Sequence, residues 1–168
     1  MPGQIPPESI SVNSAPAYSP RPVRSPWFAN SRISTPPLVE AFYRRIWNEG
    51  NAGAIPELLA PDITFRGSLG TELRGHKAFR DYVSSVRNAL SEYHCEILTC
   101  VSEGNLAFAQ MRFSGRHVGE FRGYSPTGKQ VHWQGAALFR FESGVITDLW
   151  VLGDLNGLDA VLKENASP

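Results

Sequence analysis

The sequence predicts an α+β domain in which helices cover one face of a curved antiparallel sheet. After residue 36, two helical patterns occupy the first half of the chain, and four segments with alternating apolar residues follow. Helices followed by a run of strands are typical of this class, whereas regular alternation would indicate a parallel sheet. The length of 168 residues fits one such domain.

The amino-terminal segment differs in composition from the rest of the chain. Residues 1–37 contain nine of the 13 prolines, together with many serines. Such a segment buries too little apolar surface to offset the entropy lost on ordering. We therefore expect a flexible Pro/Ser-rich arm over residues 1–36 and a folded domain over 37–168. The apolar cluster at 26–28 could pin the arm onto the domain or onto a partner subunit.

Charge and hydropathy exclude several partners. Lys and Arg number 16 and Asp and Glu also number 16, so the net charge is zero. A nucleic-acid binder would show a basic excess, and we expect no such partner. No apolar run reaches the roughly 18 residues that a membrane span needs. The first residues lack the pattern of a secretory signal, so a cytoplasmic location is expected, although Arg21, Arg24 and Arg32 leave an organelle-targeting alternative.

The first helix is predicted over residues 38–47, where apolar side chains recur at helical spacing. Thr35 is suited to cap it, and Pro36 is suited to its first position because a proline there loses no hydrogen bond. Gly50 is expected to end the helix.

A second helix is predicted after Gly75. Before it, a helical turn is expected at 54–59, a short strand at 62–65 and a glycine-rich loop at 67–70. The apolar stripe of this helix consists of Phe79, Val83, Val86 and Leu90.

Four strands and a closing helix follow. The strands are expected at 93–101, 106–114, 130–141 and 145–152, and the helix at 155–162. The third and fourth strands are joined by Glu142, Ser143 and Gly144, which suit a three-residue hairpin loop.

That loop predicts a register in which Asp148 faces Leu138 and Trp150 faces Ala136. Side chains two positions apart share a face of the strand. One face then carries Ile146, Asp148, Trp150, Leu152, Gln134, Ala136 and Leu138. The other carries Trp133, Ala137, Phe139, Phe141, Thr147, Leu149 and Val151. Since both faces are largely apolar, each needs a cover, and we expect a homodimer through the sheet.

Asp148 is the exceptional residue of this hairpin because it is a carboxylate within an apolar strand. A buried charge is costly unless it is paired or faces a cavity. In an apolar cavity its pKa would rise, which would suit a proton shuttle near neutral pH. The alternatives are an aspartate in solvent, or one paired with Arg140 or Arg112.

The sequence offers no sign of a metal or an organic cofactor. Cys95 and Cys100 are five positions apart in a predicted strand, on opposite faces and about 16 Å apart. That distance excludes a disulfide and a shared zinc site. The four histidines lack the spacing of metal ligands, and no glycine-rich nucleotide-binding loop occurs.

Four segments, in this order, resemble the SnoaL-like polyketide cyclase family. They are Ser-Gly-Arg-His-Val-Gly-Glu-Phe at 114–121, Pro-Thr-Gly-Lys at 126–129, Phe-Arg-Phe-Glu-Ser-Gly-Val-Ile at 139–146, and Trp150 followed by Asp154. The resemblance covers about residues 37–162. It implies an NTF2-like, cystatin-like cone with the helices on the concave face of the sheet.

The resemblance also implies a cofactor-independent intramolecular aldol condensation. In the family, an aspartate two residues before the tryptophan acts as acid and base, and this position is Asp148. A histidine usually lies fourteen residues upstream, where this chain has Gln134. Gln134 can donate a hydrogen bond to a carbonyl but cannot exchange protons, and His132 could replace the missing imidazole.

The expected substrate is a small hydrophobic carbonyl compound. Residues expected to contact it are Trp150, Trp47, Tyr43, Phe65, Phe108, Leu138 and His117. Phe65 and Phe108 could instead be ordinary core residues. His117 could serve a structural hydrogen bond.

Two other functions remain open at this stage. One is a non-catalytic ligand-binding or dimerisation module of the same fold. The other is a dehydratase or hydrolase in which His132 or Tyr43 donates a proton opposite Asp148. A closed pocket with a paired Asp148 would favour binding alone, and a buried, unpaired Asp148 beside an open cavity would favour catalysis.

Overall fold

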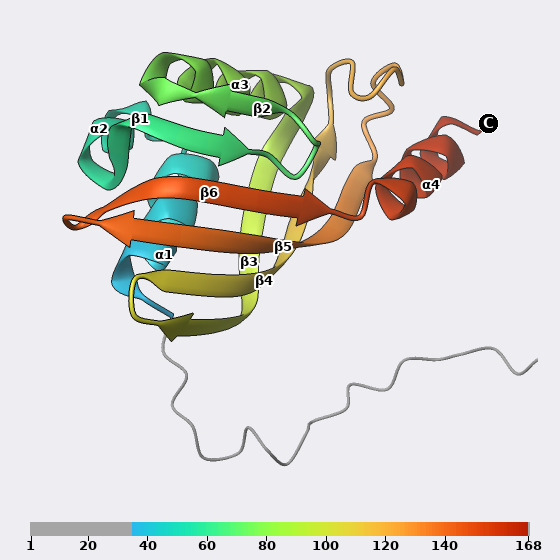
Figure 1. Cartoon of the computed structure of the whole chain (residues 1–168). Helices are drawn as coiled ribbons and strands as arrows, with labels where there is room; N and C mark the ends of the chain where they lie inside the picture. Colours follow the sequence, from blue (N-terminus) through green and yellow to red (C-terminus); the bar gives the residue numbers. More distant parts are fainter. Residues whose placement is uncertain (1–34, 168) are drawn as a thin grey trace, which may run out of the picture. The chain divides into compact units, whose positions relative to one another are not determined.

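The computed structural model describes residues 35–167, so the predicted arm over 1–36 lies almost entirely outside the described residues. Along the chain the elements are α1 (Pro37–Ala41), η2 (Phe42–Asn48), η3 (Ala52–Ala54), α2 (Ile55–Leu58), β1 (Leu59–Arg66), β2 (Glu72–Arg74), α3 (Gly75–Ala89), β3 (Leu90–Glu103), β4 (Leu106–His117), β5 (Gln130–Glu142), β6 (Val145–Gly153) and α4 (Leu155–Ala166). This arrangement confirms the predicted α+β class (Figure 1).

The strands form one sheet in the order β2-β1-β6-β5-β4-β3. Neighbouring strands are antiparallel except for β1 and β6, which run parallel. The expectation of a wholly antiparallel sheet was therefore wrong at this pair. The three-residue strand β2 was not predicted, because so short a segment has no recognisable alternation.

The first helix begins at Pro37 and continues from α1 into the π-helical segment η2. Pro36 occupies the cap position and no side chain caps the helix, so the predicted capping role of Thr35 was wrong. The wider turn of a π-helix places residues four and five apart on one side. The residues of η2 that are buried on the sheet are Phe42, Tyr43, Ile46 and Trp47.

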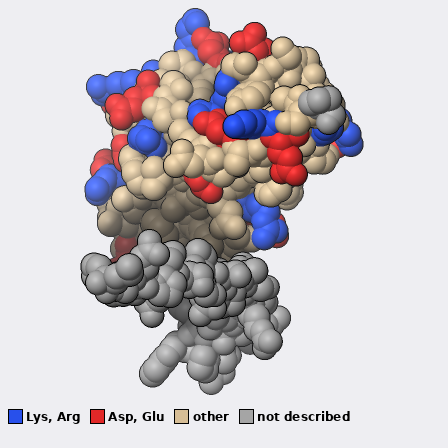
Figure 2. Space-filling view, turned by 90° about the vertical axis from the view of Figure 1, so that its right-hand side faces the viewer, with Lys and Arg blue, Asp and Glu red and all other residues tan. Residues whose placement is uncertain are grey.

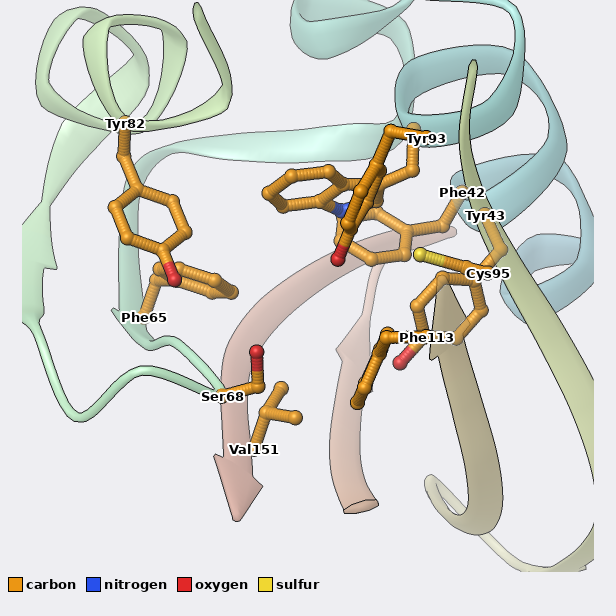
Figure 3. A pocket seen from close by; sticks show the side chains of 10 residues that line it. Phe42, Tyr43, Phe65, Ser68, Tyr82, Tyr93, Cys95, Phe113 and Val151 are labelled. Carbon is orange, nitrogen blue, oxygen red and sulfur yellow. The ribbon is translucent and has the colours of Figure 1, made fainter. Parts of the chain in front are cut away.

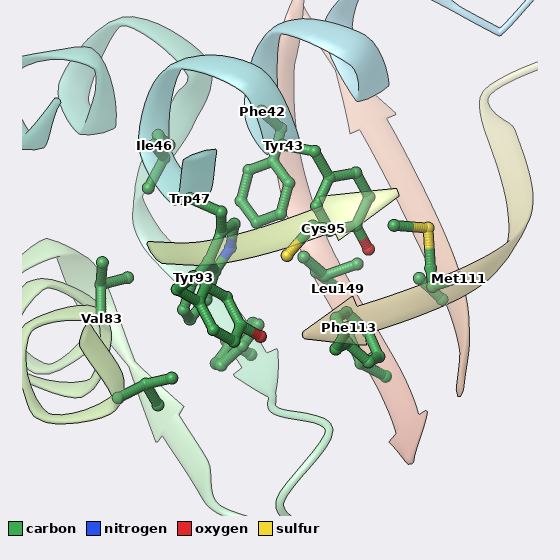
Figure 4. Close-up of a cluster of buried hydrophobic side chains, with 14 of the residues drawn as sticks. Phe42, Tyr43, Ile46, Trp47, Val83, Tyr93, Cys95, Met111, Phe113 and Leu149 are labelled. Atoms are coloured by element: carbon green, nitrogen blue, oxygen red, sulfur yellow. The ribbon is translucent and has the colours of Figure 1, made fainter. Parts of the chain in front are cut away.

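Helix α3 covers the sheet beside this first helix. Its buried residues are Phe79, Val83, Val86 and Ala89, which repeats most of the predicted stripe. Leu90 belongs instead to β3, since its backbone is already extended. Together η2, α3 and the inner face of the sheet enclose the core, which is dense in aromatic rings (Figure 4).

The β5–β6 hairpin has a shorter loop than expected. Glu142 pairs with Val145, and the loop residues Ser143 and Gly144 have φ values of 51° and 83°. Two consecutive positive φ angles are those of a type I′ turn. A bulge beside Phe141 then places Asp148 opposite Arg140.

The predicted partners were therefore wrong by two residues, since Trp150 faces Leu138 and Leu152 faces Ala136. An error of two leaves side chains on their expected face. Ile146 is the exception, because the bulge turns it into the core, where it is fully buried.

A second bulge corrects the prediction for the cysteines. It lies between Ile97 and Thr99 in β3, and it reverses the alternation of side chains along the strand. As a result Cys95 and Cys100 are both buried on the core side, and both are free thiols.

The two faces of the sheet differ in exposure. The inner face, including Trp133, Phe139 and Leu149, is buried under the helices. The opposite face carries five of the six exposed large apolar residues in the described chain, and we call these five the outer stripe: Val101, Phe108, Leu138, Trp150 and Leu152. The register places the first four of them side by side across β3, β4, β5 and β6.

Charged side chains of both signs are interspersed over the side of the molecule shown in Figure 2. The ion pair with the best geometry joins Arg122, in the loop before β5, to Asp159 of α4, with nitrogen–oxygen distances of 2.6 and 2.7 Å. None of the helices within residues 35–167 is long and apolar enough to cross a lipid bilayer.

The Arg122–Asp159 pair predicts a pH-dependent contribution to stability. Hydrogen bonds from Arg122 lower the pKa of the Asp159 carboxyl. The contribution is therefore complete above the ordinary carboxyl pKa of about 3.9 and is lost as the pH falls through the lowered value. At pH 7 we expect Asp159→Asn to reduce the free energy of unfolding by about 1 kcal/mol or less.

Urea unfolding at several pH values measures this effect. Asp81→Asn, which removes the exposed Lys77–Asp81 pair of α3, is the matched control and should have a smaller effect. If the difference in free energy of unfolding between the wild type and Asp159→Asn were the same at pH 2 as at pH 7, the Arg122–Asp159 pair would not be its cause.

Candidate functional site

A cavity lies between η2, α3 and the inner face of the sheet. Its walls are mainly aromatic, and its lining residues are Phe42, Tyr43, Trp47, Phe65, Ser68, Tyr82, Tyr93, Cys95, Phe113 and Val151 (Figure 3). Its free volume is about 20 Å³, about enough for one water molecule. In this conformation the cavity is too small for any larger ligand.

Three of the residues expected to contact substrate line this cavity. They are Tyr43 and Trp47 from η2 and Phe65 from β1. The π-helical turn directs the first two to the same side, and Phe65 points inward because β1 pairs it with the buried Leu149 of β6. All three are at least 95% buried, so they also belong to the core.

The cavity wall offers neutral hydrogen-bond donors. The Tyr43 hydroxyl is buried and has no hydrogen-bond partner within residues 35–167. Burial raises the pKa values of Tyr43 and Tyr93 well above the ordinary range, and it raises the pKa of Tyr82 to about 12. At neutral pH these phenols keep their protons and can donate to a ligand oxygen.

A resident base is absent from this part of the chain. No Asp, Glu or His is among the ten residues that line the cavity. Cys95 is the remaining titratable group, and burial raises the pKa of its thiol, so it stays protonated. The cavity wall can therefore polarise a carbonyl placed against it, but it supplies no strong proton acceptor.

Asp148 lies on the other face of the sheet, and its expected place in an apolar cavity was wrong. It is half-buried and accepts a hydrogen bond from the Thr64 hydroxyl of the neighbouring strand β1. Next to it, Trp150 is 40% exposed and lies under the Arg66 guanidinium, 5.5 Å from its ring centre. The inward positions of β6 are instead occupied by Leu149 and Val151.

The other expected site residues are also outside the cavity. Gln134, His132, Phe108 and Leu138 are exposed on the same outer face as Asp148. The register brings His132 beside Ser114, and Gln134 beside Arg112, well away from the cavity walls.

His117 is fully buried at the end of β4 but does not line the cavity. Its Nδ1 is 3.3 Å from the Thr127 hydroxyl, and its backbone bonds Gly128 and Lys129. This matches the structural alternative for His117. Its other ring nitrogen, Nε2, is buried without a partner.

Seven lining residues were not predicted as site residues: Phe42, Ser68, Tyr82, Tyr93, Cys95, Phe113 and Val151. A signal for several of them was present in the alternation of the strands. Val151 shares its face with Leu149, and Tyr93 alternates with Cys95 along β3. The alternation did not show which face of the sheet the helices cover, so these strand residues could not be assigned to the cavity.

Metal ligands do not cluster in the described chain. Within residues 35–167 there is no group of three His, Cys, Asp or Glu side chains that could hold a metal ion.

Residues 38–162 match the sequence profile of the SnoaL-like polyketide cyclases. The chain belongs to this family. The match covers nearly all of the described domain, including both helices over the cavity and every strand of the sheet.

Two characterised relatives are cyclases. The SnoaL-like chain is 31% identical over 114 residues to aklanonic acid methyl ester cyclase DauD of Streptomyces sp. (strain C5), which covers 66% of this chain and 68% of DauD. It is also 31% identical over 114 residues to aklanonic acid methyl ester cyclase DnrD of Streptomyces peucetius, which covers 66% of this chain and 75% of DnrD.

Solved structures agree with the fold. TsrD from Streptomyces laurentii is 27% identical with a TM-score of 0.67, covering 74% of this chain and 91% of TsrD. A protein with a ketosteroid isomerase-like fold from Catenulispora acidiphila is 20% identical with a TM-score of 0.64, covering 76% of this chain and 92% of that one. The expected NTF2-like α+β cone is thereby confirmed.

The burial of both cysteines predicts that neither reacts in the native protein. Thiolates are the reactive form, and burial raises the pKa of each thiol. We expect no modification by a thiol-specific disulfide reagent at pH 8 in the folded chain and complete modification of both in guanidinium chloride. Rapid reaction of Cys95 in the native protein would show that the cavity opens to solvent much more readily than its closed walls indicate.

Proposed function

We propose that this SnoaL-like chain is a polyketide-cyclase-type enzyme that binds a hydrophobic carbonyl metabolite in the interior cavity. In this proposal the Tyr43 phenol donates a hydrogen bond to the enolate oxygen that forms during reaction. The observation that carries the proposal is the Tyr43 hydroxyl, which is buried in an aromatic cavity without a partner.

The energetics of that hydroxyl support a ligand oxygen beside it. A buried polar group without a partner costs about 1–3 kcal/mol. A carbonyl of the substrate would satisfy it, and an enolate would do so more strongly because hydrogen bonds to charged acceptors are stronger. A preorganised donor of this kind favours the charged intermediate over the neutral substrate.

The reaction proposed is an intramolecular aldol ring closure, as the cyclase relatives suggest. A proton leaves the carbon next to one carbonyl, and that carbon bonds to a second carbonyl carbon. The proton then returns to the new alkoxide, so atoms balance without an oxidant or a cofactor. Because the cavity wall supplies no carboxylate or imidazole, the proton acceptor is water or an oxygen of the substrate itself.

A second candidate is binding without turnover. It is favoured by a specific observation, because the cavity is small and none of its ten lining residues is an aspartate, a glutamate or a histidine. A catalytic role for Asp148, Gln134 and His132 stays a prediction. Those residues would have to act on a substrate at the outer face, where Asp148 is bonded to Thr64.

Two conservative variants distinguish these possibilities, with aklanonic acid methyl ester as the test substrate. Tyr43→Phe removes one hydroxyl that has no hydrogen-bond partner within residues 35–167, so the fold should remain intact. We expect it to lower the single-turnover rate by about 10²–10³-fold, the usual effect of losing one oxyanion donor. Asp148→Asn should leave the rate unchanged.

The opposite result would move the chemistry to the outer face. If Asp148→Asn abolished turnover and Tyr43→Phe did not, the cavity proposal would be wrong. The second candidate would be established instead if the wild type bound the ester tightly and chromatography over several hours detected no conversion of it.

We also propose that the chain forms a homodimer through the outer stripe. The stripe runs across four strands and is about 40–50% exposed at each of its large side chains except Leu138, which is 38% exposed. Contiguous apolar patches on a soluble surface typically mark interaction sites. A second copy is the occupant favoured by charge, because residues of opposite sign, Arg140 and Asp148, adjoin Leu138 and Trp150 and could pair with their counterparts in another copy.

A charge placed in the stripe tests this proposal. We expect Leu138→Glu to shift the chain from dimer to monomer in sedimentation equilibrium, since each copy would bury an unpaired carboxylate in the interface. The matched control is Val118→Glu, because Val118 is 45% exposed but lies outside the stripe. A monomeric wild type, or equal effects of both variants, would contradict the proposal.

A further inference from the structure

Tyr82 differs from the other residues of the cavity wall. Nine of the ten lining residues are buried, and Tyr82 is the one that is partly exposed. It descends from α3, and Figure 3 shows its ring at one side of the cavity with the hydroxyl directed toward the loop that carries Ser68. Tyr82 is therefore the lining residue whose side chain reaches the surface of the molecule.

A groove lies on the other side of Tyr82. Its free volume is about 350 Å³, and its lining residues are Leu69, Thr71, Tyr82, Ser85, Val86, Ala89, Glu120, Phe121 and Arg122. Tyr82 is the residue that lines both this groove and the interior cavity. The space on its outer side is therefore many times larger than the space on its inner side.

The ring is held by contacts that a rotation can break and remake. Its centre is 6.0 Å from the Trp47 ring in an edge-on arrangement and 5.3 Å from the Phe65 ring. The Leu69 backbone and the Ser68 side chain act on the Tyr82 oxygen as hydrogen-bond donors and lower its pKa, although burial raises that pKa overall. Aromatic pairs of this kind add a modest stabilisation beyond the area that they bury.

The position of the Tyr82 ring requires a glycine at residue 67. A Cβ atom at residue 67 would lie only 2.3 Å from the Tyr82 hydroxyl oxygen and 2.6 Å from the ring carbon that bears it. Backbone conformation does not require a glycine here, since the φ of Gly67 is not in the left-handed region. The absent side chain at Gly67 therefore leaves room for the hydroxyl of Tyr82.

The other walls of the groove are fixed by backbone hydrogen bonds. The N–H groups of Val118 and Gly119 both donate to the Ala89 carbonyl, at 2.9 and 3.0 Å. Arg122 is anchored to α4 through Asp159. Widening the passage by moving this loop would break several bonds, whereas rotating Tyr82 breaks only the contacts of one side chain.

We propose that Tyr82 is the gate of the interior cavity, and that its rotation joins the cavity to the groove in one site for a planar, mostly apolar molecule. This inference rests on the proposed function in one respect, namely that the ligand enters the interior cavity. An open gate would let the buried end of the ligand reach Tyr43 while the rest stays in the groove, between Phe121 and α3. Tyr82 is then a positioning residue that controls access.

The gate can be tested without any ligand. In a chain whose Trp27, Trp133 and Trp150 are replaced by phenylalanine, the fluorescence of Trp47 reports contact with acrylamide. We expect little quenching in that chain. We expect a severalfold higher quenching constant in Tyr82→Ala and in Gly67→Ala, because the added methyl group of the second variant forces the ring out of its closed position.

The matched control for this measurement is Arg80→Ala. Arg80 is exposed on the same helix, two residues from Tyr82, and lines neither the cavity nor the groove. Its quenching constant should equal that of the parent. The Gly67→Ala result keeps the test valid should Tyr82→Ala fail to fold, since its change lies on another element.

Ligand kinetics form the second part of the test. Stopped-flow binding of 1,8-dihydroxyanthraquinone, a planar carbonyl compound, is measured in the otherwise unaltered protein. If the open conformation is only a minor state of the wild type, both variants, in which the gate stays open, should have an association rate constant about tenfold higher or more. The dissociation rate constant should rise as well, since the closed ring no longer retains the ligand.

The outcomes separate the gate from the proposed function. Increased quenching in both gate variants, but no dye binding in any protein, would support the gate and overturn the binding proposal. Unchanged quenching in both folded variants would overturn the gate, whatever the dye does. Equal rate constants in wild type and both gate variants would also overturn it.

Discussion

The contact on which the rest of the structure depends is the packing of η2 against the inner face of the sheet. Phe42 and Tyr43 both meet the ring of Phe139 edge-on, with centre separations of 5.7 and 5.8 Å. This contact decides which face of the sheet is the inside. Once Phe139 is covered, Leu149 and Val151 of the neighbouring strand must also point inward, because side chains alternate along a strand. Asp148 and Trp150 must then point outward. The position of the cavity, the exposure of the outer stripe and the surroundings of Asp148 follow from this choice of face.

The sequence carried enough information for most of the elements but not for that choice. Helical spacing located α3, and the alternation in β5 and β6 grouped Asp148 with Trp150 correctly. Alternation defines two sets of side chains, and in this hairpin both sets are apolar, so hydrophobicity could not say which set meets the helices. The resemblance to a cyclase family favoured the face with the carboxylate, and the helices cover the other. The bulges at Phe141 and Ile97 were not predictable either, because each depends on pairing with a neighbouring strand rather than on local sequence.

The outer face has two proposed roles that compete for the same surface. A dimer through the outer stripe would cover Trp150 and Leu138 and would enclose Asp148, which lies beside Trp150 on the same strand. A substrate that needed Asp148 as a base would have to occupy that same surface. The hydrogen bond from Thr64 also occupies one carboxylate oxygen. In a dimer this bond would keep the half-buried charge partnered, which is what burial of a carboxylate requires. The interior cavity and the outer stripe can serve binding and assembly at the same time, whereas chemistry at Asp148 and dimerisation at the stripe exclude each other.

The interior cavity has to reconcile stability with function. Its lining residues form much of the aromatic core, so a cavity held permanently open would forfeit packing that the domain needs. A closed cavity with one movable wall avoids that loss. Tyr82 is suited to be that wall because it is the partly exposed member of the lining, and because Gly67 leaves room for its hydroxyl without involving the backbone of the sheet. Tyr43 can then remain unpartnered in the empty protein, at a cost limited to one hydroxyl, and gain its hydrogen bond only when a ligand enters. Binding energy would in this way come partly from relieving an unsatisfied group that the folded protein already contains.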